Sequence, residues 1–146
     1  MSVAMLMEHD RSQPGTAHSA GHEELSPTIL VVEDDADILR QIAFNLERRG
    51  YRVSTATNGD EALRVMLQVR PQLLITDIMM PGMDGYELVE TLRRDIELSD
   101  LPVIMLTARS EDVDVTRGYA AGTDLYLTKP FRPAELIAFV DRILSL

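Results

Sequence analysis

Short apolar runs alternate along the chain with stretches in which apolar residues recur every three or four positions. Three of the runs are continuously apolar, which is typical of strands that are buried on both faces. These runs are Thr28–Val32, Leu73–Thr76 and Pro102–Leu106. Two further segments, Val53–Ala56 and Asp124–Thr128, complete a set of five predicted strands.

The stretches between these runs have the spacing of amphipathic helices. Ile38, Ile42 and Leu46 repeat every four residues, and Gly50 follows as a helix stop. The same spacing predicts helices over 59–70, 84–96, 111–121 and 133–145. Strand and helix therefore alternate five times, which predicts one parallel sheet with helices on both faces, joined by right-handed crossovers.

Polar residues suited to chemistry follow four of the predicted strands. They are Glu33, Asp34, Asp77, Thr107 and Lys129. In an open parallel sheet, ligands bind outside the carboxyl ends of the strands, where the strand order reverses. We therefore expect these residues to meet in space although they lie far apart in the sequence.

The only lysine of the chain is one of these candidates. Lys129 stands against thirteen arginines and is followed directly by Pro130. An ammonium is a compact point charge, unlike the planar guanidinium fork, so its use here fits a site that needs one strong positive charge. Taken alone, a chance exception to the arginine bias explains the position equally well.

The three acidic candidates need charge compensation. Two carboxylates about 4 Å apart repel each other by roughly 4 kcal/mol at an effective dielectric constant of about 20, so three of them require a cation or lose a charge. A hard divalent ion such as Mg²⁺ accepts oxygen ligands and bridges to phosphoryl oxygens. The pattern therefore favours a Mg²⁺ site beside Lys129.

Taken together, these segments resemble the receiver domain of two-component response regulators over about residues 28–146. The matching segments are Ile29–Asp35, Leu74–Gly85, Val103–Ala108, Gly122–Asp124 and Lys129–Phe131. Each is a weak signal alone, but their order between the predicted elements is specific. The resemblance implies a flavodoxin-like, doubly wound α/β fold, with five helices around a five-stranded parallel sheet in the strand order 2-1-3-4-5.

The resemblance also implies a role for each matching position. Asp77 would accept a phosphoryl group as the nucleophile, forming an aspartyl phosphate. Thr107 and Lys129 would bind phosphoryl oxygens once the group arrives. The Mg²⁺ ligands would be Glu33, Asp34, Asp77 and the backbone carbonyl of Met79. The protein would be a switch that modifies itself rather than a turnover enzyme.

Three further expectations concern the surroundings of this site. Asp35 is either a carboxylate that supports the metal ligands or the N-cap of the first helix, and the cap is favoured. Tyr126 would turn inward as Thr107 moves onto the phosphoryl group, unless it is an ordinary, partly exposed tyrosine on an edge strand. The switching surface would consist of the fourth helix, the fifth strand and the fifth helix. The Lys129-Pro130 bond would be cis, as the resemblance implies.

Composition limits the remaining possibilities. The chain has 146 residues, of which 45% are hydrophobic, and this suits one domain plus a tail. Cysteine is absent, in agreement with the cytoplasm, and no apolar run approaches the roughly 18 residues that span a membrane. The net charge of -10 argues against sequence-independent binding to nucleic acid. No output domain follows the last predicted helix, so we expect a single-domain, chemotaxis-regulator-like receiver that acts through protein contacts.

Residues 1–27 have a different composition from the rest. They are rich in turn-forming residues without a helical or strand period, which predicts a disordered tail ahead of a receiver domain over 28–146. All three histidines, His9, His18 and His22, lie in this segment. We therefore expect the phosphoryl donor to be a separate sensor histidine kinase or histidine phosphotransfer protein.

Three other classes of protein compete with this interpretation. Haloacid dehalogenase-type phosphatases need a second aspartate two positions after the nucleophile, where this chain has Met79. A flavodoxin-like cofactor binder needs a phosphate-binding loop after the first strand, where the acids Glu33 and Asp34 would repel a phosphate. A degenerate receiver, which binds partners without being phosphorylated, stays the main alternative.

Overall fold

The structure, a computed structural model, describes residues 4–6, 26–108 and 114–144. Its strands are β1 (Ala4–Leu6), β2 (Thr28–Val32), β3 (Arg52–Ala56), β4 (Leu73–Asp77), β5 (Val103–Ala108) and β6 (Leu125–Lys129). Its helices are α1 (Ala36–Arg49), α2 (Gly59–Val69), α3 (Gly85–Arg93), α4 (Val115–Ala121) and α5 (Pro133–Leu144).

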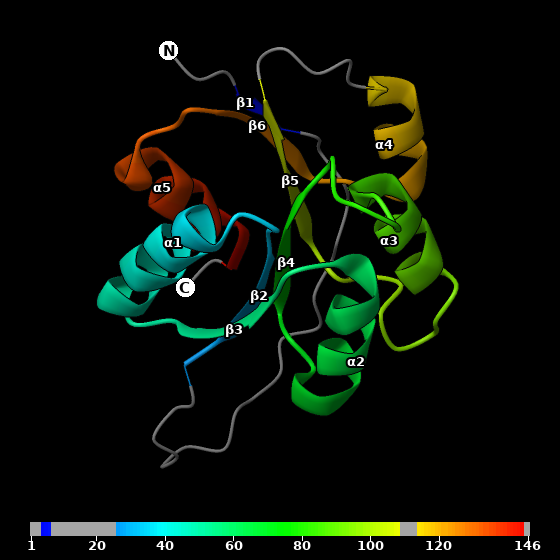
Figure 1. The fold of residues 1–146 in the computed structure, drawn as a ribbon, viewed down its shortest axis with the longest axis horizontal. Helices are drawn as coiled ribbons and strands as arrows, with labels where there is room; N and C mark the ends of the chain where they lie inside the picture. The colour runs from blue at the N-terminus through cyan, green and yellow to red at the C-terminus, as the bar shows by residue number, and fades with distance from the viewer. Residues whose placement is uncertain (1–3, 7–25, 109–113, 145–146) are drawn as a thin grey trace.

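Five of the strands form a parallel sheet in the order β3-β2-β4-β5-β6. This is the expected order 2-1-3-4-5, so the predicted fold class is confirmed. Figure 1 shows the sheet nearly edge-on, with α1 and α5 on one face and α2, α3 and α4 on the other. None of the helices that the structure describes has the length and apolar character needed to cross a membrane.

The sheet has a sixth strand that the sequence did not predict. Residues Ala4–Leu6 pair antiparallel with Leu125–Leu127 of β6, at the top of Figure 1. The expectation of disorder throughout residues 1–27 is therefore wrong for this segment, while residues 7–25 lie outside the described part. An edge strand presents unpaired N–H and C=O groups, and three residues suffice to pair with them although they are too few to show a period.

Local signals fix the ends of the helices. Gly50 adopts the left-handed conformation, with φ of 109°, and ends α1 as expected. The third helix is shorter than predicted, because it ends at Arg93 rather than near residue 96. The chain continues from there in tight turns, in which Leu98 N–H donates to the Asp95 carbonyl and Leu101 N–H to the Leu98 carbonyl.

Two apolar cores fill the space between the sheet and its helices. The core under α1 and α5 includes Leu46 and Leu136, and the core under α2, α3 and α4 includes Met66 and Leu92. The central strand β4 is buried along its whole length, so its side chains point alternately into both cores. This burial holds the carboxyl end of β4 in a fixed position.

Candidate functional site

The acidic candidates meet at the carboxyl edge of the sheet. Glu33 follows β2, Asp77 ends β4, and carboxylate oxygens of Glu33, Asp34 and Asp77 lie within 4.8 Å of one another. Glu33 and Asp77 are buried, at 1% and 4% exposure, whereas Asp34 is exposed. Three carboxylates at this spacing repel one another unless a cation joins them.

Lys129 reaches the two buried carboxylates from the end of β6. Its ammonium nitrogen lies 3.1 Å from Glu33 Oε1 and 3.1 Å from Asp77 Oδ1. Burial lowers the pKa of this ammonium, but the charges of Asp77 and Glu33 outweigh burial and raise the pKa above its ordinary value. Lys129 therefore stays protonated near neutral pH and compensates part of the negative charge.

The loop after Asp77 folds back tightly against that residue. The Gly85 N–H donates to the Ile78 carbonyl at 2.8 Å. A Cβ at Gly85 would lie only 2.4 Å from the Asp77 carbonyl oxygen, so this approach requires glycine. Met79 lies in the same loop and is 59% exposed, and the metal contact of its backbone carbonyl stays a prediction.

The Asp35 side chain acts as the N-cap of α1 rather than as a member of the acidic cluster. Its carboxylate accepts hydrogen bonds from the backbone N–H groups of Asp37 and Ile38, at 2.9 and 3.2 Å. Its backbone N–H donates to Glu33 Oε2 at 3.0 Å. Asp35 thus orients Glu33 through the backbone while its charge stabilises the start of the helix.

Thr107 and Tyr126 lie on the neighbouring strands β5 and β6. Thr107 is buried, and its hydroxyl donates to the Ala108 carbonyl at 3.2 Å. Tyr126 is also buried, with 2% exposure, and β1 covers the outer edge of its strand. It is therefore not the partly exposed edge tyrosine of the alternative interpretation. The Lys129-Pro130 peptide bond is cis.

No pattern in the sequence indicated a role for Arg93, which connects three segments near the end of α3. Its guanidinium donates to four backbone carbonyls, at distances between 2.7 and 3.2 Å. The acceptors are Leu98, Ser99, Ala121 and Gly122. This side chain holds the carboxyl end of α4 against α3, a role that depends on where the helices lie in space and leaves no pattern in the sequence.

The donor set of the acidic cluster fits Mg²⁺. It consists of carboxylate oxygens only, which are hard ligands, and three formal negative charges face one ammonium. The exposure of Asp34 leaves one side of the cluster open to solvent. Glu33, Asp34 and Asp77 are the residues that would hold the ion.

Fold and cluster together define a doubly wound parallel α/β domain with an acidic site at the carboxyl ends of its strands. The family described as response regulator receiver domain matches residues 29–141. The chain therefore belongs to this family, whose members are the receiver domains of two-component signalling systems.

Individual relatives agree with this assignment. The transcriptional regulatory protein AfsQ1 of Streptomyces coelicolor is 39% identical over 118 residues, which cover 81% of this chain and 51% of that protein. A response regulator structure from Chloroflexus aurantiacus is 37% identical, with a TM-score of 0.77 over 83% of this chain and 99% of that one. The chemotaxis response regulator CheY4 of Vibrio cholerae is 32% identical, with a TM-score of 0.75 over 81% of this chain and 98% of that one. The chain spans about half the length of the curated relatives it matches.

Proposed function

We propose that the protein accepts a phosphoryl group on Asp77 from a phosphohistidine, in a reaction that requires Mg²⁺, and thereby changes the surface that it offers to a partner. The observation that supports this most directly is the meeting of three carboxylates with one ammonium at the carboxyl edge of the sheet. Such a cluster is costly unless it binds a cation and a group that uses the remaining positive charge.

Each residue of the cluster has a distinct task in this proposal. An Asp77 carboxylate oxygen attacks phosphorus, the new P–O bond replaces the P–N bond of the phosphohistidine, and the leaving imidazole takes up a proton. Lys129 pairs with one phosphoryl oxygen and Thr107 donates a hydrogen bond to another. Bound Mg²⁺ supplies charge neutralisation at the phosphoryl oxygens, since phosphoryl transfer depends mainly on positioning and electrostatic stabilisation.

The phosphoryl donor in this proposal is a separate protein. The described residues include no histidine, because His9, His18 and His22 all lie in segments outside them. A sensor histidine kinase or a histidine phosphotransfer protein therefore supplies the group. The domain acts as a switch in a two-component or phosphorelay pathway rather than as a turnover enzyme.

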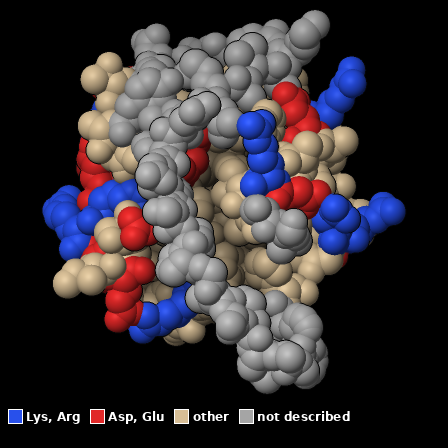
Figure 2. All heavy atoms as spheres, turned by 180° about the vertical axis from the view of Figure 1, so that it is seen from behind, with Lys and Arg blue, Asp and Glu red and all other residues tan. Residues whose placement is uncertain are grey.

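The proposed output surface consists of α4, β6 and α5. Tyr126 lies on β6, and its burial supports a role as the residue that follows Thr107. On the face drawn in Figure 2, the described acidic and basic side chains are interspersed rather than gathered in one basic patch. Together with the net charge of -10, this supports output of this domain through protein contacts rather than through direct binding to nucleic acid.

Acetyl phosphate with Mg²⁺ tests the proposal directly, with intact mass as the measurement. The wild-type protein gains one phosphoryl group and Asp77→Asn gains none. Asp84→Asn is a matched control, because Asp84 caps α3 in the same loop and asparagine caps a helix equally well. A wild-type protein that gains no mass would instead support a phosphorylation-independent interaction module. An Asp77→Asn variant that still gains mass would mean that another residue accepts the phosphoryl group.

A paired substitution tests the metal ligands. Asp34→Asn removes a charge from the cluster and lowers the Mg²⁺ affinity by about tenfold or more. Asp35→Asn removes a charge one residue away but keeps the helix cap, so the affinity stays near that of the wild type. Isothermal titration with Mg²⁺ measures both, and an equal loss in the two variants would show that the Asp35 carboxylate does support the metal site.

A further inference from the structure

A second tyrosine lies next to the phosphoacceptor loop. Tyr86 follows Gly85, whose backbone packs against the carbonyl of Asp77 and bonds to Ile78. The first turn of α3 is thereby held in direct contact with the backbone of Asp77.

The hydroxyl of Tyr86 binds the residue at which α4 begins. Tyr86 is buried, with 5% exposure, and its hydroxyl oxygen accepts a hydrogen bond from the Asp114 N–H at 2.8 Å. The Asp114 carboxylate accepts the Arg117 N–H at 2.9 Å, and the Asp114 carbonyl accepts the Gly118 N–H at 3.0 Å. Tyr86 therefore holds the residue that organises the first turn of α4.

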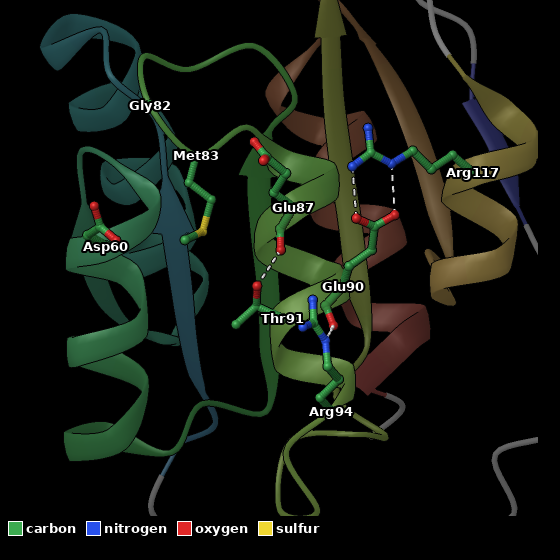
Figure 3. Close-up of a pocket in the computed structure, with 8 residues that line it drawn as sticks. All are labelled: Asp60, Gly82, Met83, Glu87, Glu90, Thr91, Arg94 and Arg117. Atoms are coloured by element: carbon green, nitrogen blue, oxygen red, sulfur yellow. Dashed lines mark hydrogen bonds and ion pairs between the residues drawn. The ribbon is translucent and has the colours of Figure 1, made fainter.

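Arg117 connects the same turn of α4 to α3 a second time. Its guanidinium lies 5.1 Å from the centre of the Tyr86 ring and binds both carboxylate oxygens of Glu90, at 2.7 and 2.8 Å. Figure 3 shows this ion pair crossing from α4 to α3, beside a shallow depression of about 460 Å³ lined mainly by polar side chains. The two contacts fix the first turn of α4 relative to the loop that starts at Asp77.

Tyr126 reaches the same turn of α4 from β6. A Cβ at Gly118 would lie 1.3 Å from the Tyr126 hydroxyl oxygen, so the hydroxyl occupies the place that any larger residue would fill. Burial first, and then interaction with the Tyr86 hydroxyl, raise the pKa of Tyr126 well above its ordinary value. The Tyr126 hydroxyl therefore lies near that of Tyr86, although it is buried without a hydrogen bond that meets full geometric criteria among the described residues. The Tyr126 hydroxyl thus lies beside Gly118, and the Tyr86 hydroxyl lies at Asp114 in the same turn of α4.

We infer that Tyr86 is a positioning residue of the switch, linking the backbone of Asp77 to the start of α4 and setting the space beside Gly118 that receives Tyr126. This inference rests on the proposed function, and it adds a connection through α3 to the one through Thr107. A change at Asp77 moves the first turn of α3, Tyr86 moves the Asp114 N–H, and the space for the Tyr126 hydroxyl opens or closes.

Removing one hydroxyl group tests the inference. Tyr86→Phe keeps the ring and its packing but deletes the acceptor for the Asp114 N–H. Tyr51→Phe is the matched control, because Tyr51 is equally buried and its hydroxyl bonds to Asp141 on the opposite face of the sheet. The measurements are the affinity for beryllofluoride in the presence of Mg²⁺ and the hydrogen exchange of the α4 amides with and without it.

We expect Tyr86→Phe to weaken beryllofluoride binding by between about twofold and tenfold, the range that one hydrogen bond supplies, and Tyr51→Phe to leave it unchanged. The amides of Asp114 and Gly118 exchange faster in Tyr86→Phe, and beryllofluoride no longer alters their protection. The double variant with Tyr126→Phe binds no more weakly than the weaker single variant, because both hydroxyl groups act through the same space.

The outcomes separate the inference from the proposed function. A Tyr86→Phe variant that binds beryllofluoride like the wild type, and whose α4 amides respond to it in the same way, overturns the role of Tyr86 alone. A wild-type protein that binds no beryllofluoride overturns the phosphoacceptor function. In that case, faster exchange at the Asp114 amide in Tyr86→Phe would show only that the two residues are in contact. The inferred role of Tyr86 in switching would then also be wrong.

Discussion

The two faces of the sheet use polar side chains in different ways. On the face of α1 and α5, the polar contact lies at the rim, where Asp141 binds Arg49 and the hydroxyl of Tyr51. On the face of α3 and α4, polar groups lie inside the packing, where Tyr86 and Tyr126 bring their hydroxyl groups to the first turn of α4. The other buried side chains beneath α1 and α5 are aliphatic, and the partly buried Phe131 and Phe139 pack against them.

This difference indicates which face is able to change its arrangement. Emptying the space of a buried leucine costs about 2 to 5 kcal/mol, whereas exchanging one hydrogen bond for another costs a fraction of the roughly 1 kcal/mol that each contributes. Two positions of α4 can therefore lie close in free energy, while α1 and α5 are held in one. In the proposed switch, the face of α1 and α5 is the scaffold, and α4 on the opposite face is the part that changes position.

Arg93→Ala is expected to cause the largest loss of stability, because Arg93 attaches α4 to α3. The substitution leaves four buried or half-buried carbonyls without their charged donor and lowers the free energy of unfolding by about 3 kcal/mol. Arg94→Ala removes an exposed neighbour with one weaker bond, to the Glu90 carbonyl, and changes stability by less than about 0.5 kcal/mol. Urea denaturation measures both, and equal stabilities would mean that Arg93 does not hold α4.

Gly118→Ala should destabilise the protein, although helix propensity alone predicts that it stabilises α4. Alanine in place of glycine favours a helix by about 1 kcal/mol, but here the new Cβ would overlap the Tyr126 hydroxyl, so we expect a net loss of about 2 kcal/mol. The control is the same substitution in a Tyr126→Leu background, where the ring that the new Cβ would meet is absent and the loss caused by Gly118→Ala should shrink. A Gly118→Ala variant as stable as the wild type would mean that Tyr126 leaves its buried position at little cost.

Acid weakens both faces, but over different pH ranges. Arg117 lowers the pKa of Glu90 from its ordinary value of 4.5, and Arg49, followed by Tyr51, lowers the pKa of Asp141 from 3.8. A carboxylate whose pKa is lower in the folded protein than in the unfolded chain stabilises the fold above its ordinary pKa. This stabilisation is lost as pH falls through the pKa of the folded protein. Both carboxylates are about a third exposed, so each contributes less than about 1 kcal/mol.

Glu90→Gln and Asp141→Asn test these two ranges separately. The wild type is more stable than Glu90→Gln at neutral pH, and this difference in the free energy of unfolding declines as pH falls below about 4.5. The corresponding difference between the wild type and Asp141→Asn declines only below about 3.8. Thermal denaturation between pH 7 and pH 3 measures both differences. A difference that stayed constant with pH would mean that the ion pair in question contributes nothing through its charge.

The sequence predicted those parts that depend on long apolar runs and on where the runs end. Continuous burial along β2, β4 and β5 leaves a strong signal, and the parallel alternation that follows allows few topologies. Because the carboxyl ends of parallel strands share one edge, the approach of Asp77 and Lys129 could also be expected. The N-cap role of Asp35 followed from its place immediately before a helical period.

The remaining features depend on distances between helices, which leave no local pattern. Tyr86 and Asp114 are 28 positions apart, and nothing in either neighbourhood indicates that a hydroxyl meets an N–H there. Gly118 resembles an ordinary helix residue until the ring of Tyr126 is placed beside it. The strand Ala4–Leu6 is too short for periodicity, and its pairing is a property of the free edge of β6.

Deleting residues 1–7 should have the smallest effect on stability. It also allows the two edges of the sheet, β6 and β3, to be compared. The few hydrogen bonds lost between β1 and β6 are nearly offset by the conformational entropy that the three paired residues regain, so the free energy of unfolding changes by less than about 0.5 kcal/mol. Amides of Leu125–Leu127 exchange faster, because part of that edge returns to water, whereas those of β3 at the opposite edge keep their rates. Equal exchange along β6 in the wild type and in the shortened protein would mean that β1 does not cover this edge in solution. The surface of α4, β6 and α5 would then be open to a partner without displacement of the N-terminal strand.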